Sequence, residues 1–179
     1  MKTMFYMSAD LSQKNVESII RGFARASSRL PDLKLVLLGS GALLGQYEAI
    51  AKDFGVLDRL VVVPWSNDVG SYMKYSKALI LASSFEGFAL VLVEAILNDC
   101  PIITTDVGAI GGIIPKEYAN IFPQDNDKIL AEKIVMVVED EQNQKEKVER
   151  AKLLALDQIP KDLDSYTKIF KESLEKTIK

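Results

Sequence analysis

The fold is indicated most directly by residues 78–105, which read ALILASSFEGFALVLVEAILNDCPIITT. The apolar runs 78–82 and 101–105 each have the length of a buried strand, and residues 88–97 between them have the length and composition of a helix. A strand, a helix and a second strand in this order predict two parallel strands joined by a right-handed crossover.

Glu94 is the one carboxylate within the apolar run Val91–Leu97. Burying an ionised carboxylate costs several kcal/mol unless hydrogen bonds or an opposite charge compensate it. We therefore predict a partner for Glu94, either a structural one, such as a lysine or the backbone, or a bound ligand. A second glutamate, Glu86, lies in the loop that precedes this run.

The rest of the chain repeats the alternation of short apolar runs with helical patterns. We therefore predict an α/β fold, with a Rossmann-like parallel sheet covered by helices on both faces. Further strands are predicted at 3–8, 34–38, 60–63 and 119–122, and further helices at 13–29, 43–54 and 69–75.

From Asp127 onward the pattern is helical and increasingly charged. One amphipathic helix is predicted through residues 129–138, and a second one through residues 163–174. The charged run 139–150 between them is typical of a solvated helix face.

Composition excludes several classes of chemistry. The 179 residues contain one cysteine, Cys100, and no histidine, which excludes an internal disulfide and any catalysis by a histidine of this chain. A net charge of -3 gives no overall case for nucleic acid as a partner. No stretch approaches the roughly 18 apolar residues of a membrane-spanning helix, so we expect a soluble, cytoplasmic protein.

Three loops with unusual chemistry follow predicted strands: 8–14, 38–43 and 83–90. Because ligands of open parallel sheets bind at the carboxyl ends of the strands, we expect these loops along one edge. Gly39-Ser40-Gly41 allows close backbone approach to a ligand, but Leu44 replaces the third glycine of a dinucleotide-binding fingerprint. A plain turn between strand and helix is the alternative.

Lys14 lies at the start of a predicted helix, where the helix dipole disfavours a cation. Either solvent exposure relieves this conflict, or Lys14 and the helix start share an anion. Gly87 and Phe88–Leu90 supply backbone amides at the start of another predicted helix, which would face a phosphate. Glu86 in the loop and Glu94 further along the helix would then flank that phosphate and hold the hydroxyls of two sugars.

Two Asp-x-Asp pairs, Asp125/Asp127 and Asp162/Asp164, have a spacing that can hold divalent metals. Each pair directly precedes an amphipathic pattern and is better interpreted as a helix start. We therefore predict no metal site.

The segment Glu86-Gly87-Phe88-x-Leu90-Val91-Leu92-x-Glu94-Ala95, followed by Pro101–Gly108, resembles the glutamate-x7-glutamate region of retaining glycosyltransferases of family 4. Residues 31–41 and 56–60 are also similar to this family, in the family's order. The resemblance implies the two-domain GT-B fold. It identifies residues 1–179 as a single donor-binding domain, the carboxyl-terminal half, without the amino-terminal acceptor domain.

The resemblance also implies roles for individual residues. Glu86 would contact the transferred sugar, Glu94 would hold the ribose, and Lys14 would neutralise the diphosphate. Glu86 and Lys14 would be the catalytic residues, and the donor-binding residues would be Gly87, Phe88, Ala89, Leu90, Glu94, Gly41, Trp65 and Ser66, with Trp65 and Ser66 near the base.

The implied function is metal-independent, retaining transfer of a sugar from a nucleotide-diphosphate donor to a glycan or lipid-linked acceptor, without a further cofactor. The resemblance is also compatible with peripheral association of a full-length protein with the inner face of the membrane. We expect the isolated half to bind nucleotide without transferring sugar.

Several positions depart from the family pattern. Residues 8–10 read Ser-Ala-Asp where an arginine is frequent, Ala89 stands at a common glycine or proline position, and Asp99 replaces a usual glycine. Asp tolerates left-handed backbone, so the turn at Asp99 can persist. The departures favour one alternative, a non-catalytic partner of another transferase. The glycine loop alone favours a second alternative, an oxidoreductase.

Overall fold

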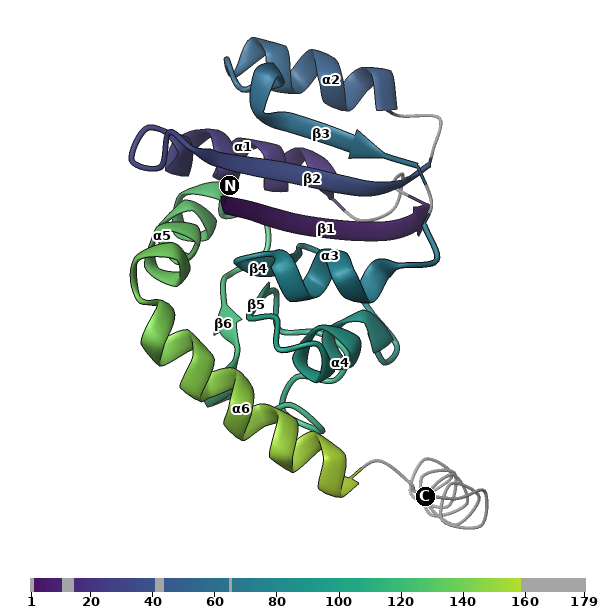
Figure 1. Ribbon diagram of the computed structural model, residues 1–179. Helices are drawn as coiled ribbons and strands as arrows, with labels where there is room; N and C mark the ends of the chain where they lie inside the picture. The colour runs from purple at the N-terminus through teal and green to yellow at the C-terminus, as the bar shows by residue number, and fades with distance from the viewer. Residues whose placement is uncertain (1, 11–14, 41–43, 65, 159–179) are drawn as a thin grey trace.

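The computed structural model describes residues 2–10, 15–40, 44–64 and 66–158, and within them all sheet pairings are parallel (Figure 1). The sheet has six strands in the order β3-β2-β1-β4-β5-β6, which confirms the predicted α/β fold. The strands are β1 Lys2–Asp10, β2 Leu33–Ser40, β3 Leu60–Val63, β4 Ala78–Leu81, β5 Ile102–Thr104 and β6 Asn120–Ile121.

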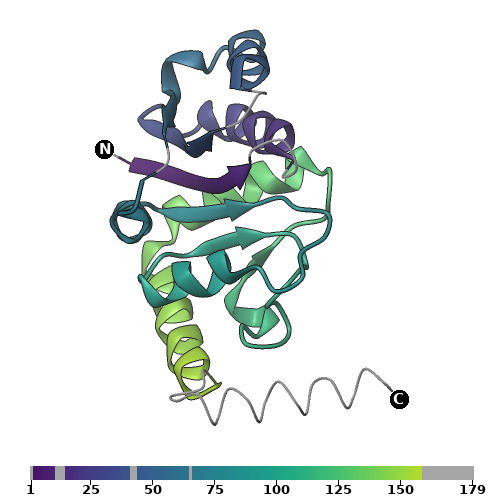
Figure 2. The same cartoon turned by 90° about the vertical axis from the view of Figure 1, so that its right-hand side faces the viewer.

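Helices cover both faces of this sheet (Figures 1 and 2). Helix α1 packs against α2 and α5, α3 packs against α4, and α6 packs against α4 and α5. The helices are α1 Val16–Ser27, α2 Leu44–Asp53, α3 Val69–Tyr75, α4 Leu90–Leu97, α5 Asp127–Glu139 and α6 Glu141–Gln158, with short 3-10 helices η2 Leu57–Arg59 and η3 Lys116–Tyr118.

The apolar pattern of the sequence explains this packing. All of the apolar residues Leu35–Leu38 are buried, as expected for a parallel strand that is covered on both faces. Ile19, Ile20 and Phe23 are fully buried on one side of α1. A Cβ atom at Gly22 would lie 2.6 Å from Leu130 Cδ2, so a larger residue at position 22 would require the Leu130 side chain of α5 to shift.

The starts of two helices differ from the prediction by two or three residues. Helix α1 begins at Val16 rather than Gln13, and α4 begins at Leu90 rather than Phe88. Helix α4 starts later because its N-cap residue, Ala89, has left-handed backbone with φ of 57°, which is not helical. Nothing in the local apolar pattern signals that conformation.

The carboxyl-terminal part of the described chain agrees with the predicted helices. Helix α5 begins at Asp127, after the N-cap Asn126 accepts a hydrogen bond of 3.0 Å from the Ile129 amide. The charged run lies in α6, which buries only one narrow side, formed by Gln144, Val148, Ala151 and Ala155. The helix predicted at 163–174 and the pair Asp162/Asp164 lie outside the described residues.

The chain changes direction between β1 and β4, which are neighbours in the sheet although β2 and β3 lie between them in sequence. Such a switch point opens a crevice at the carboxyl ends of the strands. The loops that follow β1, β2 and β4 leave from this one edge because all strands are parallel, as predicted.

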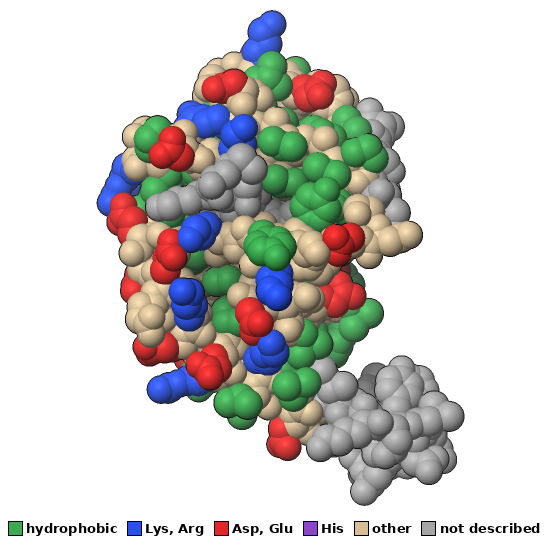
Figure 3. Space-filling view, viewed as in Figure 1, with side chains coloured by type: hydrophobic (Ala, Val, Ile, Leu, Met, Phe, Trp, Pro, Cys, Tyr) green, Lys and Arg blue, Asp and Glu red, His purple; other side chains and the backbone are tan. Residues whose placement is uncertain are grey.

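Positive and negative side chains are interspersed over the face shown in Figure 3, in keeping with the small net charge. Among the helices of the described residues, none combines the length and the apolar character that a membrane crossing needs.

Candidate functional site

A chain of hydrogen bonds at the carboxyl ends of β4 and β5 orients Glu86. The Thr105 hydroxyl donates to the Ser83 carbonyl at 2.6 Å, and the Ser83 hydroxyl donates to Glu86 Oε1 at 2.7 Å. Ser83 and Thr105 are 1% and 3% exposed, whereas Glu86 is half-buried. A buried hydroxyl that donates to a carboxylate makes a strong, directional contact. The Glu86 carboxylate is therefore oriented by a hydroxyl group that is itself buried.

The first turn of α4 lies beside Glu86 and lacks a side-chain cap. Its N-cap residue is Ala89, which has no polar side chain, and the Leu92 amide bonds to the Ala89 carbonyl at 2.9 Å. The first N–H groups of a helix have no partner within the helix and carry the positive end of its dipole. An anion is a suitable partner for these groups.

Gly108, in the loop after β5, holds this helix start in place. Its φ is +62°, and a Cβ atom there would lie 2.5 Å from Ala89 Cβ and 2.7 Å from the Phe88 carbonyl oxygen. Only glycine combines this backbone with such close approach. By contrast, a Cβ atom at Gly87 would meet nothing within 4 Å. The Gly87 backbone is therefore open to a ligand.

The neighbouring helix α1 starts in the same way. Its N-cap, Asn15, has left-handed backbone with φ of 51° and makes no capping hydrogen bond with its side chain. The Asn15 side chain instead donates to Asp125 Oδ1 at 2.7 Å. Because β1 and β4 are adjacent, two helix starts without side-chain caps flank the switch point.

Glu94 is exposed, so the prediction that its carboxylate is buried is wrong, and its role as a ribose ligand stays a prediction. Helix α4 buries one side, formed by Leu92, Val93, Ala95 and Ile96, against the rest of the fold. Glu94 falls on the other side, one turn after Leu90, which is itself 65% exposed. Glu94 lies four residues after Leu90, or about 6 Å along the axis, and its side chain leans back toward the start of α4.

Apolar side chains surround the Glu86 loop on the surface. Phe85 is 82% exposed and Phe88 is 44% exposed, and with Leu90 they form an apolar rim beside the start of α4. This rim distinguishes the site from an ordinary polar loop.

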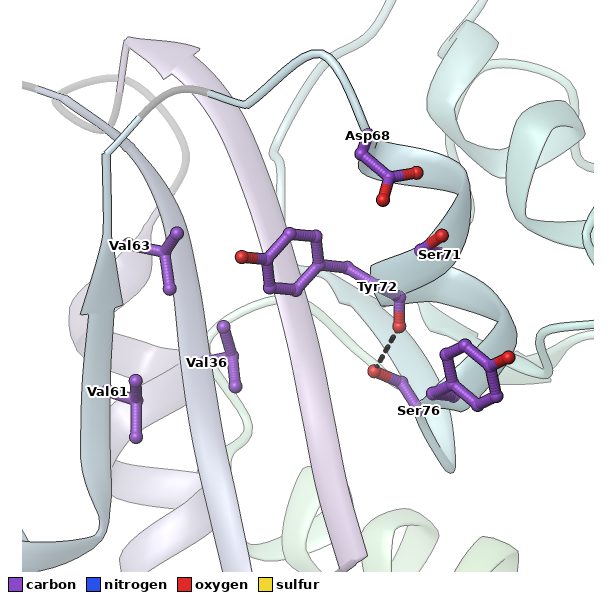
Figure 4. A pocket seen from close by; sticks show the side chains of 8 residues that line it. Val36, Val61, Val63, Asp68, Ser71, Tyr72 and Ser76 are labelled. Carbon is purple, nitrogen blue, oxygen red and sulfur yellow. Dashed lines mark hydrogen bonds between the residues drawn. The ribbon is translucent and has the colours of Figure 1, made fainter.

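Two hollows lie on either side of the switch point. The first, of about 500 Å³, separates α3 from β2 and β3 and is lined by Val36, Val61, Val63, Asp68, Ser71, Tyr72, Tyr75 and Ser76 (Figure 4). We name it the Tyr72 hollow. The second, of about 420 Å³, lies beyond β4 and is lined by residues 83–84, 105–107 and 121–124. We name it the Gln124 pocket.

The structure brings together Glu86, the predicted cradle Gly87–Leu90 and Glu94 around the start of α4. Ser66 lies at the same edge after β3, where its hydroxyl accepts a hydrogen bond of 3.1 Å from the Asp68 amide. Three strand spacings, or about 14 Å, separate β3 from β4. Lys14, Gly41 and Trp65 lie outside the described residues.

Sequence reasoning missed Ser83, Thr105 and Gly108 as site residues. Ser83 and Thr105 each follow a buried strand, at positions from which both hydroxyls meet at one edge. Polar residues directly after adjacent apolar strands were the available signal.

The pair Asp125/Asp127 acts as a structural element in the described chain. Asp125 accepts from Asn15, and Asp127 Oδ2 lies 2.9 Å from Arg25 Nε, directly before and within the start of α5. Among the described residues, no three carboxylate, cysteine or histidine side chains converge in a way that could hold a metal ion.

The parallel sheet, its strand order and the helices on both faces match the carboxyl-terminal domains of GT-B glycosyltransferases. The family model of glycosyl transferases group 1 matches residues 1–154, and the chain belongs to this family.

Two relatives show the range of similar enzymes. The chain is 30% identical, over 144 residues, to N-acetylgalactosamine-N,N'-diacetylbacillosaminyl-diphospho-undecaprenol 4-alpha-N-acetylgalactosaminyltransferase of Campylobacter jejuni; the match covers 79% of this chain and 39% of the relative. It is 26% identical, over 152 residues, to N-acetyl-alpha-D-glucosaminyl L-malate synthase of Bacillus anthracis, with 84% and 40% covered. The chain therefore spans about two fifths of the length of these relatives.

Solved structures share the fold. The carboxyl-terminal domain of a group 1 glycosyl transferase, LpcC, from Francisella tularensis superposes with a TM-score of 0.79 at 20% identity, covering 89% of this chain and 87% of that one. A mutant of S. aureus TarM, in complex with Fondaparinux, alpha-GlcNAc-glycerol and UDP, superposes with a TM-score of 0.85 at 16% identity, and the match covers 94% of this chain and 35% of that one.

Proposed function

We propose that this chain is the donor-binding half of a retaining, metal-independent glycosyltransferase that uses a nucleotide-diphosphate sugar. The observation that carries the proposal is the pair of helix starts without side-chain caps, α1 and α4, on adjacent strands. Two such starts favour a ligand with closely spaced negative charges, and a diphosphate has this chemistry.

Each part of the donor has a suitable partner along the edge. Lys14 and the Gly87–Leu90 amides would stabilise the charge that develops on the β-phosphate when the nucleotide leaves. Glu94, exposed about one turn from the start of α4, is suited to a ribose hydroxyl. Glu86, oriented by Ser83, is suited to a hydroxyl of the transferred sugar.

The base is proposed to lie by the Tyr72 hollow. Val63 and Asp68, on either side of the loop that contains Trp65 and Ser66, both line this hollow. Figure 4 shows Tyr72 reaching across it toward β3. Apolar walls with a few polar groups suit a flat heterocycle.

The acceptor is proposed to be a glycan or a lipid-linked sugar that a further domain binds. The name of the Campylobacter relative includes a diphospho-undecaprenol-linked acceptor. The chain covers well under half of that relative. We therefore expect this half to bind nucleotide without transferring sugar.

Calorimetric titration with UDP, GDP and ADP tests the proposal. At least one nucleoside diphosphate should bind, and Lys14→Ala and Glu94→Ala should each weaken binding by about tenfold or more, since each removes a contact to a charged or sugar group. Lys128→Ala and Glu149→Ala, at exposed positions of α5 and α6, are matched controls that should stay within about twofold.

Two outcomes would contradict the site assignment. One is that none of the three nucleotides binds to the native chain, which would favour the non-catalytic partner. The other is that binding is the same in Lys14→Ala and Glu94→Ala as in the native chain. Added chelator should leave the affinity unchanged, and a loss of affinity in EDTA would contradict metal independence.

A further inference from the structure

The Gln124 pocket has the size and the lining of a site for a small polar ligand. Its volume of about 420 Å³ lies within the usual range for ligand sites. Ser84, Asp106 and Gln124 form an exposed polar rim, and the half-buried Val107 and Ile121 form an apolar floor.

This combination matches the surface of a sugar ring. A pyranose has C–H bonds on its faces and hydroxyl groups around its edge, so it needs both apolar contact and hydrogen-bonding groups. The rim supplies a hydroxyl, a carboxylate and an amide, which together can donate to and accept from ring hydroxyls. Lys116 Nζ pairs with Asp106 Oδ2 at this rim.

The pocket is continuous with the Glu86 network. Ser83, which donates to Glu86 Oε1 at 2.7 Å, also lines the pocket, as does Thr105, which holds the Ser83 carbonyl. A sugar whose hydroxyl contacts Glu86 therefore has the pocket directly beside it. Ser83 and Thr105 are almost completely buried, so this wall of the pocket belongs to the packed interior.

The strand order sets the direction in which the donor extends. The proposed base position follows β3, the two helix starts follow β1 and β4, and β5 and β6 lie about 5 Å and 10 Å further along the edge. A donor that runs from base to diphosphate in this direction carries its sugar toward β5 and β6. The Gln124 pocket occupies that end.

We propose that the Gln124 pocket binds the sugar ring carried by the nucleotide diphosphate, and that Ser84, Asp106 and Gln124 recognise hydroxyls beyond the one held by Glu86. The inference rests on the proposed function of the same edge. It makes this rim, rather than the glutamate pair, the part of the chain that distinguishes one donor sugar from another.

The test compares nucleotide with nucleotide sugar in the same variants. Gln124→Ala should weaken binding of the preferred sugar derivative about three- to tenfold, as expected for one lost hydrogen bond, and leave the parent nucleoside diphosphate within about twofold. UDP-glucose, UDP-galactose and UDP-N-acetylglucosamine, or the corresponding GDP or ADP sugars, are the probes. Gln142→Ala, on the exposed side of α6, is the matched control and should change neither affinity.

Amide chemical shifts provide a second measurement that does not need the nucleotide site. Methyl glucoside, methyl galactoside and methyl N-acetylglucosaminide at millimolar concentrations should shift the amides of Ser84, Asp106 and Gln124. Ser84→Trp, which places a large side chain at an exposed rim position, should abolish those shifts while the rest of the spectrum stays native.

The outcomes separate this inference from the proposed function. If nucleoside diphosphates bind but Gln124→Ala leaves the affinity for every sugar derivative unchanged, the pocket assignment is wrong and the proposed function stands. Glycoside shifts at the rim without any effect of Gln124→Ala on the nucleotide sugars would also overturn it, in favour of an acceptor sugar. If no nucleotide binds, the inference fails together with the proposed function, and glycoside shifts at the rim would then show a sugar pocket that does not serve a nucleotide donor.

Discussion

Left-handed residues occur at both edges of the sheet, but at opposite ends of the helices. At the amino edge, Gly55 and Asp99, with φ of 69° and 58°, follow the carboxyl ends of α2 and α4. Their turns close backbone hydrogen bonds, as in Cys100 N to Ala95 O at 2.9 Å and Asp99 N to Ile96 O at 3.1 Å. This is the usual way to end a helix.

At the carboxyl edge, Asn15 and Ala89 have almost the same φ, 51° and 57°, but stand at helix starts. An N-cap residue ordinarily has extended backbone and a side chain that accepts from the first turn, and neither residue provides this cap. The same backbone conformation thus accompanies closed backbone hydrogen bonds at one edge, and at the other it accompanies N-cap residues that provide no side-chain cap. The comparison supports the proposed donor site at the carboxyl edge and assigns ordinary helix termination to the amino edge.

Among the substitutions that test this comparison, Gly108→Val is expected to change the free energy of unfolding most. A Cβ atom at this position would lie 2.5 Å from Ala89 Cβ, and a β-branched residue strongly disfavours the φ of +62°. We expect a loss of about 2–5 kcal/mol in the free energy of unfolding, from backbone strain together with overpacking. Urea denaturation measures it, and calorimetry should show that nucleotide binding is lost as well.

Gly45→Val is the matched control for Gly108→Val. Gly45 lies in α2, where a Cβ atom would meet nothing within 4 Å, so the change should alter stability by less than about 0.5 kcal/mol. Equal stability of the two variants would mean that the α4 start does not depend on the loop after β5.

Ser83→Ala should have the next largest effect. The substitution removes the hydroxyl that donates to Glu86 Oε1 at 2.7 Å, within a wall that is almost completely buried. We expect a loss of about 1–2 kcal/mol in stability, because the contact involves a charged partner that is only half-buried. Binding of a nucleotide sugar should weaken more than binding of the nucleoside diphosphate.

Ser28→Ala serves as the control for Ser83→Ala. The Ser28 hydroxyl donates to the Arg25 carbonyl at 3.1 Å on an exposed helix end, where water can replace it. The affinity for the nucleotide sugar relative to that for the nucleoside diphosphate is compared in both variants. If Ser83→Ala and Ser28→Ala have the same stability and the same ratio of these affinities, Ser83 does not position Glu86.

Glycine at the two left-handed positions tests the comparison directly. Ala89→Gly should raise stability by about 0.5–1 kcal/mol, because relief of left-handed strain exceeds the added entropy of the unfolded chain. Asp99→Gly should change stability by less than about 0.5 kcal/mol, since Asp tolerates this backbone and the Asp99 side chain, paired with Lys152 at 2.6 Å, is 64% exposed. Thermal or urea unfolding of both variants measures the difference, and equal gains would remove the distinction between the edges.

The sequence predicted the strands and helices well because their apolar periods are strong. The predicted strand 60–63 and helix 69–75 coincide with β3 and α3. Asp99 was expected to keep a left-handed turn, and its φ of 58° confirms it. At Ala89, where the family commonly has glycine or proline, the φ of 57° agrees with glycine but not with proline, and the apolar pattern alone placed Ala89 inside a helix.

The site was predictable only in part, because its geometry depends on contacts between distant residues. The group of Glu86, Gly87–Leu90 and Glu94 follows from one continuous segment, and the structure keeps it together. The contact of Thr105 with Ser83 spans two strands, and no local pattern encodes it. The burial of Glu94 was predicted wrongly because a continuous apolar run does not indicate which side of a helix faces the core. Helix α4 is covered on one side only.

The smallest effect at neutral pH is expected for Cys100, which precedes β5 at the amino edge. Burial raises the pKa of the Cys100 thiol from 9.0 to about 12. In the unfolded chain the thiol loses its proton near pH 9, so above that pH the unfolded state binds fewer protons and stability falls as pH rises. At pH 7 the group contributes almost nothing, and at pH 10 it costs about 1.4 kcal/mol.

Unfolding of the native chain and of Cys100→Ala between pH 7 and pH 10 isolates this contribution, because all other titrating groups are common to both. The native chain should lose about 1.4 kcal/mol more than the variant over this range. Nucleotide affinity at pH 7 should be the same in both, since Cys100 lies at the edge where helix ends are closed by backbone hydrogen bonds. If the free energy of unfolding falls with pH equally in Cys100→Ala and in the native chain, the thiol ionises in the folded state as it does in the unfolded one. A change in nucleotide affinity at pH 7 would show that the two edges are not independent.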